Sequence, residues 1–99
     1  MPKKREPKPW DRRPYESKQA YQAFMVYMDL GLDRSLAATG RELGKSTTLM
    51  SRWSARWAWV ARTDAYDYEA QIREDEAILK EREREAVREY LSFAFDRRG

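Results

Sequence analysis

The sequence predicts an all-α protein, a small three-helix domain followed by one long C-terminal helix that we expect to be oligomeric. All four prolines lie within residues 1–14, so helix formation is unhindered after them. Between residues 17 and 57, glycines and helix-capping residues separate three amphipathic segments. Residues 59–97 contain neither proline nor glycine, which is typical of a single long helix.

Residues 1–14 form the first of three predicted regions, an extended, proline-rich basic arm. Proline excludes a helix here and favours an extended, polyproline-like chain. Trp10 differs from its polar neighbours. Because an indole is costly to leave in water, we expect Trp10 to dock on the folded domain.

Residues 15–58 form the second region, which holds three predicted helices. The first begins after Ser17, a good N-cap residue, and runs to Leu30, with Gly31 as its stop. An aromatic stripe at helical spacing marks its buried face. The stripe consists of Tyr21, Phe24, Tyr27 and Met28.

A tight turn is predicted between the second and third helices. The second helix spans residues 34–43, with Asp33 as its cap. Gly44 supplies the positive φ that the turn needs, and Ser46 stands at the N-cap of the third helix. Gly40, one turn before Gly44, is small enough to let two helices cross closely. The inward residues of the second helix are Leu36, Ala37 and Leu43.

The third helix, residues 47–57, completes a helix-turn-helix pattern and is the predicted recognition helix. Leu43, Met50 and Trp53 recur at spacings that place them on the buried side. The outward side is polar and basic, and it is able to meet the major groove of DNA. An ordinary helical hairpin with a polar face would show the same pattern. The predicted DNA-binding residues here are Lys45, Ser46, Thr47, Thr48, Ser51, Arg52 and Arg56.

The third region, residues 59–99, is predicted to be one long helix for packing and oligomerisation. The segment 57–59, Trp-Ala-Trp, either holds a kink after the third helix or continues it. We expect a stripe near the start of the long helix to pack on the three-helix unit. The stripe consists of Val60, Ala61, Ala65, Tyr68 and Ile72.

An apolar patch returns at the far end of this helix, after an almost entirely charged middle. A fold-back onto the domain would need a turn, and neither proline nor glycine lies between residues 60 and 96 to signal one. Because an apolar patch on a projecting helix needs a cover, we expect it to join subunits or to meet a partner protein. The predicted oligomerisation residues are Val87, Tyr90, Leu91 and Phe95.

Charge is distributed unevenly along a chain whose net charge is +3. Residues 1–13 carry six basic and two acidic side chains, whereas residues 67–99 carry seven basic and ten acidic ones. The basic charge therefore lies on the arm and the motif, where phosphates would be met. The arm residues that we expect to support DNA binding are Lys3, Lys4, Arg5, Lys8, Arg12 and Arg13.

Composition argues against catalysis and against a metal centre. The chain has no cysteine and no histidine, so it lacks thiolate ligands, the commonest metal ligand and the usual general base. It contains neither a Walker-type loop nor a dinucleotide fingerprint. No apolar run approaches the ~20 residues of a membrane span. We therefore expect an intracellular protein that is not an enzyme and needs no cofactor or metal.

Five segments then follow one another in a distinctive order. They are Trp10-Asp-Arg, Glu16-Ser-Lys-Gln-Ala-Tyr-Gln-Ala-Phe24, Gly31-Leu-Asp-Arg-Ser-Leu36, Leu43-Gly-Lys-Ser46, and the run from Arg52-Trp-Ser54 through Trp59-Val-Ala-Arg62 to Ala65-Tyr-Asp67. In this order they resemble the helix-turn-helix small subunits of bacteriophage terminases, the DNA-packaging motors. The resemblance covers the chain from residue 10 to about residue 70.

The resemblance implies a function. In this family, the helix-turn-helix binds the packaging site of double-stranded viral DNA, and a helical region assembles into a ring. A C-terminal segment engages the terminase large subunit, which holds the ATPase and nuclease. The setting would be the cytoplasm of a bacterial host. Many such subunits are longer, so residues 87–95 would have to serve both assembly and docking.

Two other functions fit the same sequence. A helix-turn-helix transcriptional regulator or mobile-element DNA-binding protein would act as a dimer at an operator. In a pure interaction protein, the domain would contact protein and the arm would bind nothing specific. Ring-like stoichiometry would favour the terminase over the regulator, and salt-sensitive preference for one duplex would exclude the interaction protein.

Overall fold

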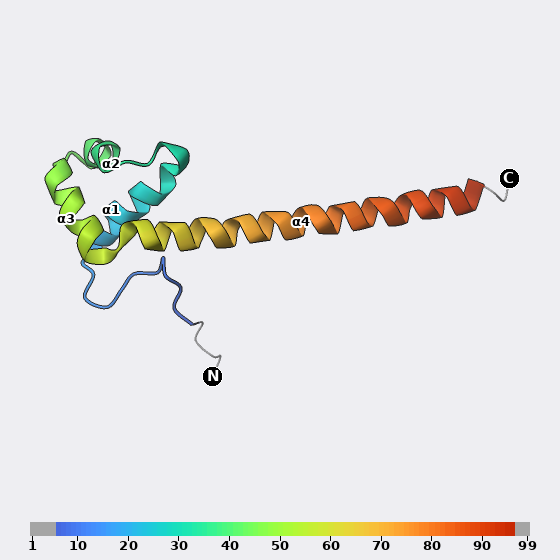
Figure 1. Ribbon diagram of the computed structural model, residues 1–99, viewed down its shortest axis with the longest axis horizontal. Coiled ribbons are helices and arrows are strands. Elements are labelled where there is room, and N and C mark those ends of the chain that lie inside the picture. The colour runs from blue at the N-terminus through green and yellow to red at the C-terminus, as the bar shows by residue number, and fades with distance from the viewer. Residues whose placement is uncertain (1–5, 97–99) are drawn as a thin grey trace. The chain divides into compact units, whose positions relative to one another are not determined.

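The computed structural model describes the backbone of residues 6–96 and the side chains of residues 6–94. Its helices are α1 (Lys18–Asp29), α2 (Leu36–Leu43), α3 (Thr47–Trp57) and α4 (Trp59–Asp96), with a short 3₁₀ helix, η1 (Gly31–Asp33), after α1 (Figure 1). The described residues include no strand, and the predicted all-α class is confirmed. None of these helices is long and apolar enough to cross a membrane.

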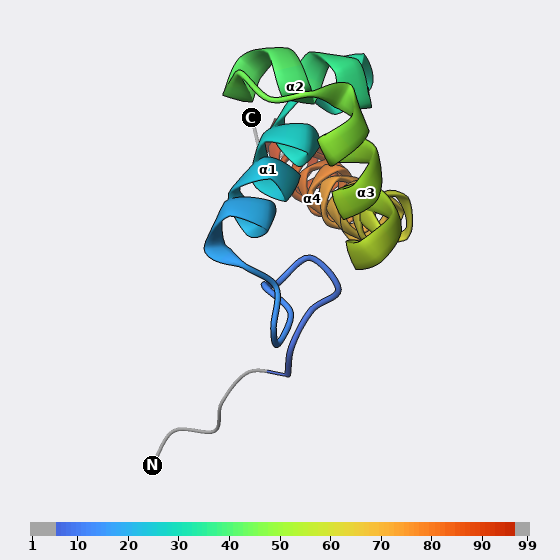
Figure 2. The same cartoon turned by 90° about the vertical axis from the view of Figure 1, so that its left-hand side faces the viewer.

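The chain divides into two compact units, one ending at Tyr66 and the other beginning at Asp67. The first unit contains the docked arm, α1, α2, α3 and the start of α4. Within it, α1, α2 and α3 each pack against the other two (Figure 2). The second unit is the remainder of α4.

Serine hydroxyls cap three of these helices. Ser17 accepts a hydrogen bond from the Ala20 N–H at 3.0 Å, and Ser46 accepts one from Leu49 at 3.1 Å, as predicted. The predicted cap of the second helix is wrong. Ser35 takes this position because its extended backbone aims its hydroxyl at the helix, whereas Asp33 lies in η1.

Gly44 has the predicted positive φ, 66°, and ends α2. Gly40 also needs to be glycine, but for a different contact from the one expected. A Cβ at Gly40 would lie 2.6 Å from the carbonyl oxygen of Lys45. The close approach is therefore between α2 and the backbone of the turn.

Ala58 ends α3 and separates it from α4. Its φ and ψ of 52° and 51° are left-handed helical. Of the two alternatives for residues 57–59, the chain therefore has the kink and does not continue as one helix. This conformation is unfavourable for a residue with a Cβ. The turn allows the next residue, Trp59, to be fully buried.

The core is built around Trp59. Its ring centroid lies 6.1 Å from that of Phe24 and 5.2 Å from that of Tyr27. Met50 from α3 is fully buried in the same cluster. Trp10 docks as predicted, with its ring edge-on to Tyr66 at 5.4 Å between centroids.

The predicted inward stripe of α4 is wrong in register. Val60 is 57% exposed and Ala61 is exposed, whereas Trp59, Arg62 and Thr63 are buried. Ala65 is half-buried, and Tyr68 and Ile72, farther along α4, are exposed. The buried residues follow helical spacing from Trp59, but two of them are polar, which conceals the pattern in a search for apolar residues.

Candidate nucleic-acid interface

The outward face of α3 and its preceding turn carries the predicted recognition residues. All seven are exposed: Lys45, Ser46, Thr47, Thr48, Ser51, Arg52 and Arg56. On the opposite face, Met50 is fully buried, and Trp53 and Trp57 are half-buried against the core. The buried face therefore fixes the rotation of α3 and turns the polar residues to solvent.

Two ridges of side chains run along the exposed face. Thr48, Arg52 and Arg56 follow one another at four-residue spacing, so they lie in one row along the helix. Thr47 and Ser51 form the beginning of an adjacent row. Hydroxyl and guanidinium groups in such rows are the donors that read base edges and phosphates.

The electrostatics of this face favour anions. No acidic residue occurs between Glu42 and Asp64 in the sequence. Among the described residues, neither Lys45 nor Arg52 forms an ion pair. The Arg56 guanidinium carbon lies 5.1 Å from the centroid of the Trp57 ring, which steadies this side chain while it stays exposed.

Ser46 has a structural role within this face. Its hydroxyl oxygen accepts the Leu49 N–H, so it supports the first turn of α3. The free N–H groups of that turn and the helix dipole give the N-terminus of α3 a partial positive charge. Lys45 stands immediately before it.

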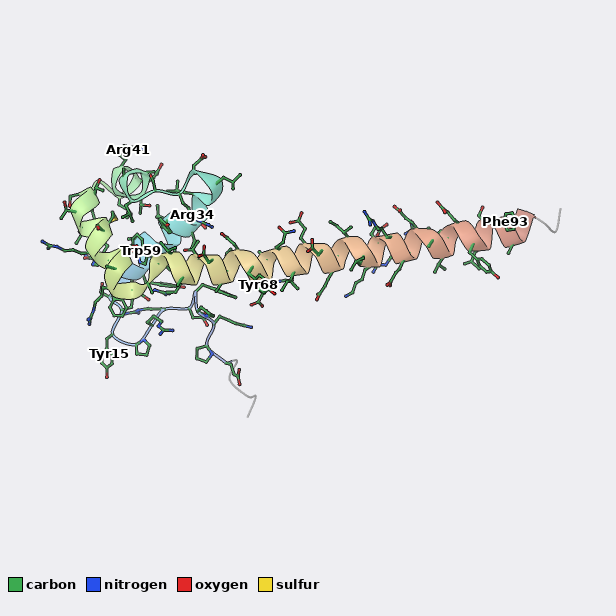
Figure 3. All side chains as sticks on the ribbon, in the orientation of Figure 1. Tyr15, Arg34, Arg41, Trp59, Tyr68 and Phe93 are labelled. Carbon is green, nitrogen blue, oxygen red and sulfur yellow. The ribbon has the colours of Figure 1, made fainter. Side chains whose placement is uncertain are left out.

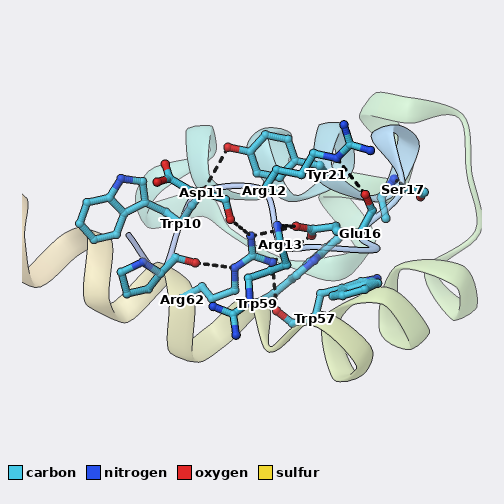
Figure 4. A network of polar contacts seen from close by, with 12 residues as sticks. Trp10, Asp11, Arg12, Arg13, Glu16, Ser17, Tyr21, Trp57, Trp59 and Arg62 are labelled. Atoms are coloured by element: carbon cyan, nitrogen blue, oxygen red, sulfur yellow. Dashed lines mark hydrogen bonds and ion pairs between the residues drawn. The ribbon is translucent and has the colours of Figure 1, made fainter. Parts of the chain in front are cut away.

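The arm is held against the domain by Arg62, a residue of α4 that is 4% exposed (Figure 4). The Arg62 guanidinium donates from Nε to the Pro9 carbonyl at 2.7 Å and from Nη2 to the Asp11 carbonyl at 2.9 Å. From Nη1 it donates to the carbonyl of Trp57, the last residue of α3, at 3.1 Å.

Glu16 completes this network as the anionic partner of Arg62. It is 1% exposed, and its two carboxylate oxygens accept from Arg62 at 2.9 and 3.1 Å. One of them also accepts the backbone N–H of Arg13 at 2.9 Å. Phe24 lies beneath, with its ring centroid 4.0 Å from the Arg62 guanidinium carbon. Paired and hydrogen-bonded in this way, two buried charges can be tolerated.

Tyr21 fastens the arm at another point. Its hydroxyl donates to the Trp10 carbonyl at 3.1 Å. Burial raises the pKa of this hydroxyl, and the Asp11 carboxylate raises it further. The phenol therefore stays protonated, and able to donate this bond, throughout the neutral range.

The basic residues predicted on the arm have different settings. Arg12 and Arg13 are exposed, and Arg12 donates from Nε to the Glu16 carbonyl at 2.8 Å. Lys8 is half-buried. Lys3, Lys4 and Arg5 lie outside the described residues. The network thus brings two exposed arginines onto the same unit as α3.

Sequence reasoning gave no role to Glu16 or Arg62, although both lie in the segments that carry the family resemblance. The two residues are 46 positions apart, so no local spacing connects them. The signal that could have found Arg62 is a charged residue at helical spacing from Trp59. That pattern indicates a buried charge which needs a partner.

The part of the chain that the structure describes holds no group of three or more acidic residues placed to hold a metal ion. Comparison with protein-family models found no match to this chain. Comparisons with curated proteins and with solved structures also found none.

Proposed function

We propose that this protein is the DNA-binding small subunit of a phage terminase, which recognises the viral packaging site and recruits or regulates the large subunit. The observation that carries the proposal is the exposed, acid-free face of α3, presented by a helix-turn-helix with Gly44 at its turn. The resemblance over residues 10 to about 70 supports the terminase assignment.

Each basic residue of this face has a separate role in the proposal. Arg52 lies in the middle of the exposed row, and its guanidinium fork matches O6 and N7 of guanine. Lys45 lies at the N-terminal end of α3 and Arg56 near the C-terminal end, where phosphates flank a helix in the major groove. Arg12 and Arg13 add phosphate contacts from the docked arm.

Self-association would supply the specificity that one small module lacks. A single helix-turn-helix reads few base pairs, and strong sites are usually read by more than one module. Several copies in one assembly multiply weak contacts through effective concentration. Cleavage and ATP hydrolysis belong to the large subunit in this scheme, and the small subunit marks the site.

Base readout by Arg52 is tested by titration with a cognate duplex and with random duplexes at one salt concentration. Arg52→Ala should lose about 1–3 kcal/mol on the cognate site and little on random DNA. Arg56→Ala should weaken both alike. Arg73→Ala, an exposed arginine of α4, is the matched control and should change neither. Unchanged preference in Arg52→Ala would refute this placement of α3.

The terminase assignment is tested by reconstitution with the large subunit. ATPase and nuclease activities are measured on cognate DNA with and without this protein, and we expect stimulation. Wild-type protein and Arg52→Ala are compared, because stimulation that depends on site recognition should fall in the variant. Absent stimulation, together with promoter repression by a dimer, would support a transcriptional regulator instead.

A further inference from the structure

Tyr15 occupies a turn position that normally belongs to glycine. Its φ is 69°, and the Glu16 N–H donates to the Arg13 carbonyl across the turn at 3.0 Å. With Pro14 before it, this is the pattern of a type II turn, whose third residue is usually glycine or asparagine. A bulky side chain at positive φ strains the backbone.

The ring of Tyr15 forms no contact with the described part of the folded domain that would offset this strain. It is 96% exposed, and Figure 3 shows it pointing away from the helices. Among the described residues it has no ring contact and no hydrogen bond. Strained residues that persist without a structural benefit cluster at binding sites.

The turn that carries Tyr15 is rigidly supported. Glu16 accepts the Arg13 N–H through its carboxylate and the Arg12 Nε–H through its carbonyl. The same carboxylate is ion-paired with Arg62, which also donates to the last carbonyl of α3. The backbone at Tyr15 is therefore held relative to α3, and binding of a ligand by its side chain would need little further ordering of the backbone.

The neighbours of Tyr15 indicate what it would bind. Arg12 and Arg13, both exposed, precede it by three and two residues and would attract phosphates. Tyrosine is among the side chains that hydrogen-bond phosphate oxygens. We propose that Tyr15 contacts the backbone of duplex DNA, with its ring against a deoxyribose and its hydroxyl donating to a phosphate oxygen. This inference rests on the proposed DNA binding and adds a residue to it.

Three substitutions at Tyr15 separate strain from contact. Tyr15→Gly should weaken DNA binding about tenfold on cognate and random duplexes alike, yet raise the melting temperature by about 4–8 °C. Tyr15→Ala should lose the same affinity without the thermal gain, because alanine keeps the strain. Tyr15→Phe keeps the ring and should lose less. In all three variants, the slope of log affinity against log salt concentration should equal that of the wild type. Arg13→Ala should reduce the magnitude of this slope by about 1.

The outcomes distinguish this inference from the function on which it rests. Wild-type affinity in Tyr15→Gly and Tyr15→Ala, with loss of preference in Arg52→Ala, would overturn the inference and leave DNA binding intact. A wild-type protein that binds no duplex even at 50 mM salt would overturn both. A Tyr15→Gly variant less stable than Tyr15→Ala would remove the strain argument and overturn the inference.

Discussion

A single side chain, that of Arg62, forms hydrogen bonds both to the arm and to the end of α3. A guanidinium has five N–H donors, and the five hydrogen bonds of Arg62 end on Pro9, Asp11, Glu16 and Trp57. A lysine could not replace it, because an ammonium has three donors and no planar fork. The arm therefore depends on arginine at this position and on the carboxylate that neutralises it.

Glu16→Gln should lower the free energy of unfolding by about 3–5 kcal/mol, because it leaves the Arg62 charge buried without an anion. The measurement is urea unfolding followed by circular dichroism. Glu42→Gln, at an exposed site on α2, is the matched control and should change stability by less than about 0.5 kcal/mol. Equal midpoints for the two variants would contradict a stabilising role for the ion pair.

Ala58→Gly should raise stability by about 1 kcal/mol, because glycine adopts the left-handed conformation that strains alanine. Ala61→Gly is the control within regular α4 helix, and it should lower stability by about 1 kcal/mol. Thermal unfolding of both variants gives the signs directly. Destabilisation of similar size in both would mean that Ala58 carries no strain.

At the scale of elements, α2 lies so close to the backbone of the turn that follows it that Gly40 has no room for a side chain. In an ordinary helix interior, Gly→Ala gains about 1 kcal/mol. Here the new Cβ would meet the Lys45 carbonyl, so Gly40→Ala should lose about 1–3 kcal/mol. Gly44→Asn is the comparison, since asparagine tolerates positive φ and the space is open. Comparison of the free energies of unfolding of the two variants checks this prediction. A stabilised Gly40→Ala would refute the close contact.

Helix ends were predictable where the signal is local. The caps at Ser17 and Ser46 and the stop at Gly44 each depend on a few neighbouring residues. The same reasoning placed the cap of α2 at Asp33, two residues before the observed cap Ser35, because the backbone conformation of this segment could not be predicted from the sequence. The inward face of α4 was missed because Arg62 and Thr63 are buried polar residues.

The candidate site likewise has features that were predictable from the sequence and one that was not. The exposed face of α3 follows from helical periodicity, since Met50 and Trp53 mark its buried side. Docking of Trp10 was predictable from its apolar character alone. The support of the arm by Glu16 and Arg62 was not, because it joins residues far apart in sequence and only the tertiary structure brings them together.

For the whole molecule, the exposed apolar residues near the end of α4 predict self-association. Val87 is 56% exposed, Tyr90 71% and Leu91 47%, while the side chain of Phe95 lies outside the described residues. Each large side chain covered in an assembly would contribute roughly 1.5–3 kcal/mol. We expect light scattering to show an oligomer at micromolar concentration.

Paired aspartate substitutions locate this interface. Val87→Asp with Leu91→Asp should dissociate the oligomer, because buried carboxylates are costly. Ile78→Asp with Leu79→Asp is the matched control, since these residues are similarly exposed but lie outside the patch, and it should leave the assembly intact. A monomeric wild-type protein would refute the prediction. Dissociation by the control pair alone would move the interface toward the middle of α4.

The bonds from Arg62 also have a consequence for the order of folding. They join Pro9 and Glu16 to a residue 53 and 46 positions away, whereas α1, α2 and α3 follow one another through short connections. Closing a long loop costs more chain entropy than pairing neighbouring helices, and local contacts form faster. The helices can therefore assemble first, and the arm closes over them last. In the native protein, the backbone N–H groups of residues 10–13, 15 and 16 would then exchange their hydrogens through a local opening that costs less free energy than unfolding of the domain.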